Sequence, residues 1–285
     1  MSETKKGLIL EGGGMRGVFT AGVLDYFIER GQKFDTCIGV SAGACMACSY
    51  LSEQKGRGYR TFVEYGDDPE YCSVKSLVKT GDYFGTEMVY EKIPNELDPY
   101  DYQTFEQCQT AFYAVVTNCD TGLPEYKRIR EMHKDIRYVR ASSSLPLMSR
   151  TVWIRKKPYL DGGITDSIPF MESQRMGNDR NVVVLTRGRD YRKEKNKMLP
   201  LIRLRYGKEF PKLVKAMERR HLEYNKTLEY LYRQEKEGKV FIIQPPAPVE
   251  ISRLEKDKKK LKQLYRQGYE TAEKQYEKMK NYLET

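Results

Sequence analysis

The sequence predicts an α/β protein, built as a three-layer α/β/α sandwich around a mostly parallel central sheet. Short apolar runs typical of buried strands recur along the chain, and segments with helical periodicity separate them. Alternation of this kind is typical of a parallel sheet that helices cover on both faces. A strongly charged helical pattern near the end of the chain adds a basic C-terminal extension to this fold.

The first part of the chain contains two strand–turn–helix patterns. Residues 7–11 and 34–40 are apolar strand candidates. Residues 18–30 repeat apolar side chains near a period of 3.6, and residues 42–52 are small and apolar all round, as in a buried helix. Residues 55–101 are rich in Gly, Tyr and charge, so we expect loops and short helices there, which form a lid or a pocket wall.

The second part of the chain continues the alternation. The remaining candidates are strands at 111–117, 126–129, 152–154, 158–160, 182–185 and 240–243, and helices at 131–143, 207–238 and 252–285. The strand at 240–243 predicts that the C-terminal region completes the same sheet. We therefore expect one domain over residues 1–250, with residues 251–285 as a basic helical extension packed on it.

The positive charge lies in the last third of the chain. Residues 191–285 hold 25 Lys and Arg against 14 Asp and Glu, a net charge of +11, whereas residues 1–190 carry −1. Such a block is typical of a solvated helical face, and after that of a surface for anionic membranes. Its aromatic residues are Tyr at helical spacings, without an RNA-binding strand motif, so nucleic acid is not expected.

The apolar runs are short. None approaches the ~18 residues of a membrane span, and the run at residues 8–10 is too short for a secretory signal. We expect a cytoplasmic protein with at most peripheral membrane contact. Among the six cysteines, Cys45 and Cys48 have CxxC spacing, but two further zinc ligands at matching spacing are missing from the sequence. Core packing on a helix is therefore expected for them, and no metal site.

A nucleophile elbow is the first of three chemical motifs. Gly39-Val40-Ser41-Ala42-Gly43 has GxSxG spacing between an apolar strand and a small-residue helix. Gly39 and Gly43 suit the crowded turn that lifts the Ser41 hydroxyl out of the sheet. The helix that starts after Ser41 offers free N–H groups and a positive dipole end to a developing negative charge.

A glycine loop follows the first strand. As a hydrolase element, it offers bare backbone N–H groups to an oxyanion, and removing one such donor typically costs ~10²–10³ in rate. Its arginine would orient the loop or attract an anionic headgroup. The candidate oxyanion-hole residues are Gly12, Gly13, Gly14, Arg16 and Gly17.

The same loop has a second interpretation. Gly12, Gly14 and Gly17 also satisfy the GxGxxG pattern of dinucleotide-binding enzymes. That pattern needs an acidic residue ~20 positions later. Asp35 is available, but it stands at the start of the next strand rather than at its end, and Ser41 would have no role. We therefore favour the hydrolase and keep the dinucleotide site as an alternative.

A serine nucleophile needs a base. The chain has only two histidines, His133 and His221, and both stand in charged helical segments typical of solvent-facing surface. Asp161, followed by Gly162-Gly163, is the better candidate, because burial would raise its pKa and its basicity. Taken alone, the same residues would suit an ordinary turn, with Gly for positive φ.

Taken together, these motifs resemble the patatin-like phospholipases. The loop fits GGGxRG, the elbow fits GxSxG and residues 161–163 fit DG[GA], in this order, and residues 117–122 and 141–146 resemble the family's mid-domain segments. The similarity covers roughly residues 5–245 and is greatest to the bacterial cytoplasmic branch. The basic extension is less typical of the family.

The resemblance implies a serine acyl hydrolase of phospholipase, lysophospholipase or esterase type. Ser41 would be the nucleophile and Asp161 the base of a Ser–Asp dyad that cleaves phospholipid or lysophospholipid acyl esters without a cofactor. The basic third of the chain leaves a further alternative open, which is a lipid-binding or regulatory adaptor with little turnover.

Overall fold

Eight strands form one sheet in the computed structural model, which describes residues 4–285. The order across the sheet is β5-β6-β3-β2-β1-β7-β8, and β4 pairs with β3 beside this path. The strands are β1 (Lys6–Leu10), β2 (Thr36–Val40), β3 (Ala111–Asn118), β4 (Leu123–Ile129), β5 (Val152–Ile154), β6 (Lys157–Asp161), β7 (Arg180–Val184) and β8 (Phe241–Ile243).

The centre of the sheet is parallel and its β5–β6 end is antiparallel. Strands β3, β2, β1, β7 and β8 run in the same direction, whereas β4 and β6 run antiparallel to β3. Central strands that are buried on both faces favour continuous aliphatic sequences. The three residues Leu8 to Leu10 have no exposed surface, in keeping with this rule.

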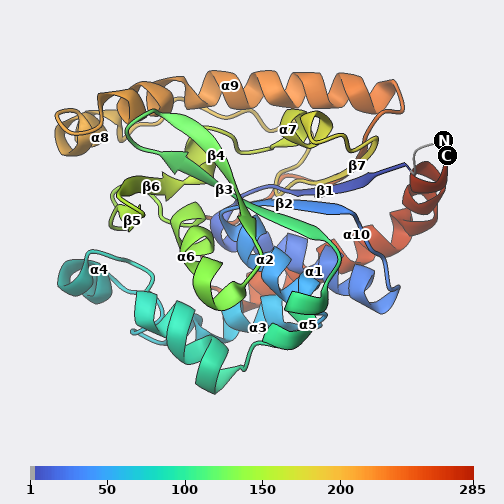
Figure 1. Ribbon diagram of the computed structural model, residues 1–285, viewed down its shortest axis with the longest axis horizontal. Helices are drawn as coiled ribbons and strands as arrows, with labels where there is room; N and C mark the ends of the chain where they lie inside the picture. Colours follow the sequence, from blue (N-terminus) through green and yellow to red (C-terminus); the bar gives the residue numbers. More distant parts are fainter. Residues whose placement is uncertain (1–3) are drawn as a thin grey trace.

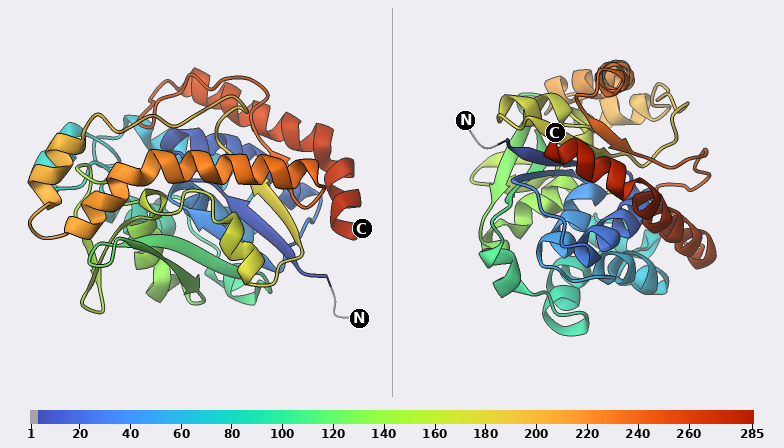
Figure 2. Two further views of the ribbon diagram at one scale, coloured as in Figure 1. Left: turned by 90° about the horizontal axis from the view of Figure 1, so that it is seen from above. Right: turned by 90° about the vertical axis from the view of Figure 1, so that its right-hand side faces the viewer.

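Helices cover both faces of this sheet, as Figures 1 and 2 show. The helical segments are η1 (Gly14–Arg16), α1 (Gly17–Glu29), α2 (Ala42–Leu51), α3 (Arg57–Val63), η2 (Glu64–Asp67), α4 (Val74–Thr80), η3 (Met88–Leu97), α5 (Tyr102–Gln107), α6 (Met132–Ser142), η4 (Gly162–Ile164), α7 (Phe170–Arg175), α8 (Leu199–Tyr206), α9 (Pro211–Lys236) and α10 (Lys258–Glu284).

The side chains of β1 show how the two layers are separated. Leu8 and Leu10 belong to the large core that α1, α2 and α10 share, whereas Ile9 belongs to a second core under α9. This alternation follows from the two-residue repeat of a strand. The structure therefore confirms the predicted three-layer α/β/α sandwich with a mostly parallel sheet and C-terminal helices.

Some helix boundaries differ from the prediction. Two short helices, α7 and α8, were not predicted, and the long helix begins at Pro211 rather than at residue 207. A proline fits the first turn of a helix but does not continue one, so α8 ends before Pro211 and α9 begins with it. The last helix begins at Lys258, because the Asp257 side chain accepts hydrogen bonds from two backbone N–H groups of its first turn.

Helix α10 packs closely on α1, and glycines allow this contact. A Cβ atom on Gly22 would lie 2.1 Å from the carbonyl oxygen of Tyr265, and one on Gly268 would lie 2.0 Å from that of Phe19. Tyr265 also donates a 2.7 Å hydrogen bond to the buried Asp25 carboxylate of α1. The C-terminal helix is thus fixed against the helix that follows the glycine loop.

Within residues 4–285, no helix is both long enough and apolar enough to cross a membrane.

Candidate active site

The register of β3 brings the two candidate dyad residues together. On one side of β3, Val40 at the end of β2 pairs with Val115. On the same side, Asp161 at the end of β6 pairs with the next residue, Val116, since β4 occupies the other side of β3. The residue that follows Val40 and the last residue of β6 therefore emerge at the same edge of the sheet, although they are 120 positions apart in the chain.

The elbow holds Ser41 in a strained conformation. Its φ of 54° and ψ of −124° are rarely adopted by a residue with a side chain. The flanking glycines allow the turn, since a Cβ on Gly39 would lie 2.6 Å from the Cα of Ala44 and one on Gly43 would lie 2.4 Å from the carbonyl oxygen of Leu10. The Ser142 hydroxyl, at the end of α6, accepts a 2.8 Å hydrogen bond from the backbone N–H of Ser41.

Ser41 and Asp161 are directly hydrogen-bonded. The Ser41 hydroxyl donates to Oδ2 of Asp161 at 2.6 Å, and the backbone N–H of Gly163 donates to Oδ1 at 2.7 Å. Asp161 is only 2% exposed. Burial raises the pKa of the Asp161 carboxyl, while the hydrogen bond from Ser41 and the nearby Arg220 guanidinium act in the opposite direction. This carboxylate is therefore more basic than an exposed aspartate and already contacts the hydroxyl.

The glycine loop lies against the elbow. A Cβ on Gly12 would be 2.9 Å from the Cβ of Ser41, and Gly14 has a φ of +58° that other residues rarely adopt. Among residues 4–285, the backbone N–H groups of Gly12, Gly13 and Gly14 donate no hydrogen bond. These three residues line one pocket with Ser41, and their N–H groups remain available as donors.

The other two candidates of the loop differ in position. Arg16 lines the same pocket and is buried, and its Nη1 donates to the carbonyl oxygen of Ile251 at 3.1 Å. Gly17 does not line that pocket. Its N–H bonds to carbonyl oxygens within the preceding turn, and a Cβ there would lie 2.8 Å from the Cβ of Ala42. The structure therefore gives Gly17 a packing contact with the elbow rather than a free donor.

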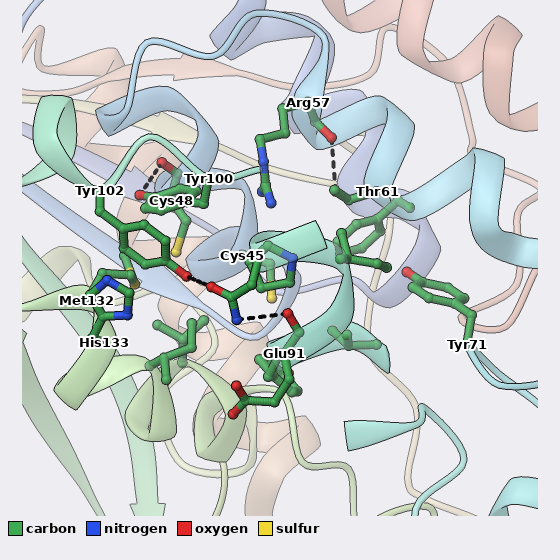
Figure 3. A pocket seen from close by; sticks show the side chains of 18 residues that line it. Cys45, Cys48, Arg57, Thr61, Tyr71, Glu91, Tyr100, Tyr102, Met132 and His133 are labelled. Carbon is green, nitrogen blue, oxygen red and sulfur yellow. Dashed lines mark hydrogen bonds between the residues drawn. The ribbon is translucent and has the colours of Figure 1, made fainter. Parts of the chain in front are cut away.

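Two apolar chambers extend from the serine. The first is about 70 Å³, includes Ser41 in its wall, and shares Cys45, Tyr71 and Val89 with a second chamber of about 120 Å³. Figure 3 shows the second chamber, with Cys45 and Cys48 of α2 facing into it and Tyr71 on one side. Residues 55–101 supply much of this wall. A slot of this composition suits an alkyl chain.

Sequence reasoning did not foresee a third, polar chamber beside the dyad. It is about 30 Å³ and contains Arg16 from the loop together with further cations from later in the chain. Those cations are Arg187, Lys193, Arg220 and Arg253. The sequence offered two signals, the arginine of the glycine loop and the charge count of residues 191–285, but neither indicated which basic side chains of the later chain turn inward.

The histidines and the CxxC pair do not join the dyad. His133 is exposed and stacks on Tyr102 at 3.7 Å between ring centroids, at the edge of the second apolar chamber. His221 is half-buried on α9 and lines neither chamber that includes Ser41. Burial raises the pKa of the Cys45 thiol to about 11, so this cysteine stays neutral beside the acyl slot.

The dinucleotide alternative is disfavoured by the position of Asp35. Its carboxylate accepts a 2.7 Å hydrogen bond from the backbone N–H of Lys6, the first residue of β1. The glycine loop follows the last residue of β1, at the opposite edge of the sheet. Asp35 is thus separated by a whole strand from the ligand that the loop would hold.

Comparisons with known proteins identify two matching family models and a bacterial relative. A family model described as "Patatin-like phospholipase" matches residues 8–173, and one described as "Domain of unknown function (DUF6363)" matches residues 210–284. The uncharacterized protein YjjU of Escherichia coli K12 is 27% identical over 248 residues, which are 85% of this chain and 69% of that protein.

More distant similarities were also found. Lysophospholipase nte1 of Aspergillus fumigatus is 26% identical over 182 residues, which are 61% of this chain but only 11% of the fungal protein. The crystal structure of VipD from Legionella pneumophila aligns with a TM-score of 0.46 and 13% identity, over 95% of this chain and 66% of that chain. Because the patatin model matches more than half of the chain, the protein belongs to the patatin-like phospholipase family.

Proposed function

We propose that the protein is a serine acyl hydrolase, of phospholipase, lysophospholipase or esterase type, that cleaves lipid acyl esters. One observation carries this proposal, which is the 2.6 Å contact between the Ser41 hydroxyl and the buried Asp161 carboxylate. Unused N–H groups of the glycine loop line the same pocket. Family membership indicates a lipid hydrolase in general terms. The geometry supports the roles that we propose for Ser41, Asp161 and the glycine loop.

The proposed reaction has two halves. Ser41 Oγ attacks the ester carbonyl carbon as Oδ2 of Asp161 takes its proton, and the N–H groups of Gly12 to Gly14 stabilise the oxyanion. The proton then passes to the departing alcohol oxygen, which leaves an acyl-enzyme. In the second half, Asp161 takes a proton from water, water attacks the acyl carbon, and Ser41 regains its hydrogen as the fatty acid leaves.

The first prediction concerns the dyad. Ser41→Ala should lower turnover of p-nitrophenyl butyrate by at least ~10³-fold, since the nucleophile is absent, and Asp161→Asn should do nearly the same, since no base remains. A fluorophosphonate probe should label one peptide, the one that contains Ser41. His221→Ala is the control and should keep its rate, because that imidazole lies outside the site. Full activity in a folded Ser41→Ala protein, with contaminating esterases excluded, rejects the proposal.

The second prediction concerns pH. Asp161 acts as a base only when ionised, so kcat/KM should fall as pH drops through its pKa. Burial raises that pKa, so the acid limb should lie above the ~3.9 of an exposed aspartate. Arg220→Gln removes a positive charge that lowers the pKa, and should therefore move the limb to higher pH.

The neighbouring Arg219→Gln is a matched control for this pH measurement. Arg219 is exposed and pairs with Glu223 at 2.9 Å, so its loss should leave the limb where it is. An acid limb at the same or lower pH in Arg220→Gln would contradict the assigned base.

The third prediction concerns the acyl slot. Val89 is half-buried and lines both apolar chambers. Val89→Trp should shorten the slot and lower the decanoate-to-butyrate ratio of kcat/KM for p-nitrophenyl esters by about tenfold, as one or two displaced methylenes are each worth about 1 kcal/mol. Leu123→Trp is the control, since Leu123 is 61% exposed on β4 and lines none of the three chambers. An unchanged ratio would place the acyl chain elsewhere.

We further propose that the protein contacts anionic membranes peripherally through α8, in its basic third, and through α4. Aliphatic side chains stand exposed on both helices, with Val74 and Val78 on α4 and Leu201 and Leu204 on α8. Figures 1 and 2 place the two helices at the same end of the molecule. Lys and Arg beside exposed aliphatic groups suit a headgroup region with negative charge.

Residues 145–148 contact both α8 and the segment after α4, and they also reach the site. The hydroxyl of Tyr206 on α8 accepts a hydrogen bond from the backbone N–H of Leu147 at 3.2 Å. The N–H of Tyr83, just after α4, donates to the carbonyl oxygen of Met148 at 2.8 Å. Leu145, in the same segment, lines both chambers that include Ser41. A membrane at this end would therefore lie close to the site.

The fourth prediction tests this contact by flotation. The protein should float with vesicles that contain phosphatidylglycerol, and the double variant Leu201→Glu, Leu204→Glu should lose most of this binding. Leu222→Glu, which charges an exposed leucine of α9, should float like the native protein. Equal flotation of both variants would contradict the docking end. Strong flotation of a native protein without esterase turnover would favour the adaptor instead.

We also retain the proposed division near residue 250. Strand β8 belongs to the sheet and precedes the division, whereas α10 follows it and packs on α1. In this description, residues 1–250 form the acyl hydrolase domain and residues 251–285 form a helical extension on its surface.

A further inference from the structure

The polar chamber beside Ser41 holds more positive charge than its contacts balance. Five basic side chains line it, which are Arg16, Arg187, Lys193, Arg220 and Arg253. Within residues 4–285, none of the five forms an ion pair shorter than 4.0 Å.

The two carboxylates of the chamber have other partners. Glu11 accepts hydrogen bonds from the N–H and the hydroxyl of Thr186 at 2.6 and 2.9 Å, and from the hydroxyl of Tyr224 at 2.6 Å. Asp161 is bonded to Ser41 and to the N–H of Gly163. The guanidinium groups and the ammonium group therefore face a chamber whose negative charges are already engaged.

Arg16 and Arg187 each donate one hydrogen bond to a backbone carbonyl but keep another N–H group without a partner. Nη1 of Arg16 donates to the carbonyl oxygen of Ile251, and Nη1 of Arg187 donates to that of Val249 at 2.8 Å. The Nε groups of both residues are buried without a partner. Nε of Arg220 donates to the carbonyl oxygen of Gly163, two residues after the base. Buried donors without acceptors are costly in a folded protein, and an anion in the chamber would satisfy them.

Burial, and after it mutual repulsion, disfavours the charged forms of the basic groups. Burial, with Arg220 nearby, lowers the pKa of the Lys193 ammonium to about 6, and this group lies 4.0 Å above the ring of Tyr224. Burial and the neighbouring arginines lower the pKa of Arg16 and of Arg220 to about 10. An anion among these groups would stabilise their charged forms.

We propose that this chamber is a subsite for the phosphate group of an acidic lipid headgroup, and that the enzyme prefers phosphate monoester substrates to neutral ones. The inference rests on the proposed acyl hydrolase function and specifies its substrate class. Several guanidinium groups around one small space suit a tetrahedral dianion, because each offers two or more N–H donors to its oxygens. The apolar chamber that includes Ser41, and the larger one that shares its wall, would hold the acyl chain.

The subsite gives the C-terminal region a chemical role. Arg187, Lys193, Arg220 and Arg253 all follow the residues 8–173 that match the patatin model, and the last two lie within the second matched region. The shared family motifs supply the dyad and the oxyanion donors. The headgroup preference comes from the part of the chain outside them.

Binding to an inactive protein tests the subsite without turnover. In a Ser41→Ala background, calorimetry at low salt should detect glycerol 3-phosphate, whereas glycerol should not bind. Adding Arg187→Gln and Arg253→Gln should weaken glycerol 3-phosphate binding at least tenfold. Arg189→Gln is the matched control and should bind normally, because Arg189 pairs with Glu235 and lies over Tyr232 outside the chamber. Thermal melts establish that each variant is folded.

Two results overturn the assignment at this stage. Absence of glycerol 3-phosphate binding in the folded Ser41→Ala protein rejects an anion subsite. Tighter binding of inorganic phosphate than of glycerol 3-phosphate identifies a site for the free anion and rejects the headgroup.

A second experiment compares the turnover of a phosphorylated substrate with that of a neutral one. The native protein should cleave a monoacylglycerol phosphate at least tenfold faster, in kcat/KM, than the monoacylglycerol with the same acyl chain. The Arg187→Gln, Arg253→Gln double variant should lose most of that ratio, whereas Arg189→Gln should keep it. Cleavage of both esters at equal rates rejects the subsite and leaves the hydrolase proposal standing. If glycerol 3-phosphate binds, but no ester is cleaved and the fluorophosphonate probe does not label Ser41, the hydrolase proposal is rejected and the anion site stands.

Discussion

Strand β3 is the element on which the site depends, because it pairs along one edge with β2 and then with β6, whereas β4 occupies its other edge. Only this double pairing brings Ser41 and Asp161 into contact. A slip of one residue between β3 and β6 would turn the Asp161 side chain to the opposite face of the sheet. The hydroxyl of Thr117 reinforces the register, since it donates to the carbonyl oxygen of Asp161 at 2.8 Å.

The dyad also depends on a balance between burial and charge. Burial makes Asp161 a stronger base, whereas the Arg220 guanidinium favours its ionised form, so the carboxylate remains charged while it gains basicity. The same guanidinium holds the carbonyl oxygen of Gly163, whose N–H supports the other oxygen of Asp161. One side chain of α9 therefore connects the electrostatics of the polar chamber to the base.

The sequence was informative where function needs particular residue types in a fixed local order. Ser41 between glycines and Asp161 before glycines could be found because tight turns restrict the residues that fit them. Gly17 was assigned a donor role that the structure replaces with packing, because spacing alone does not show which N–H groups a short helical turn uses. Arg16 was singled out from its place in the glycine loop, but the other four cations of the polar chamber were not, since later loops and the face of α9 reach the site only through tertiary packing. The short helices α7 and α8 were missed because one or two turns give too little periodicity.

The close packing of α10 on α1, at Gly22 and Gly268, affects when the protein can complete its fold during synthesis. Helix α1 emerges early from the ribosome, yet the segment that covers it, including Tyr265, follows Asp25 by 240 positions. Until that segment is made, α1 exposes an apolar face and the dyad lacks Arg253 beside it. A nascent chain thus carries Ser41 without the cations that surround it in the folded protein, and the proposed lipid cleavage would await the completed fold.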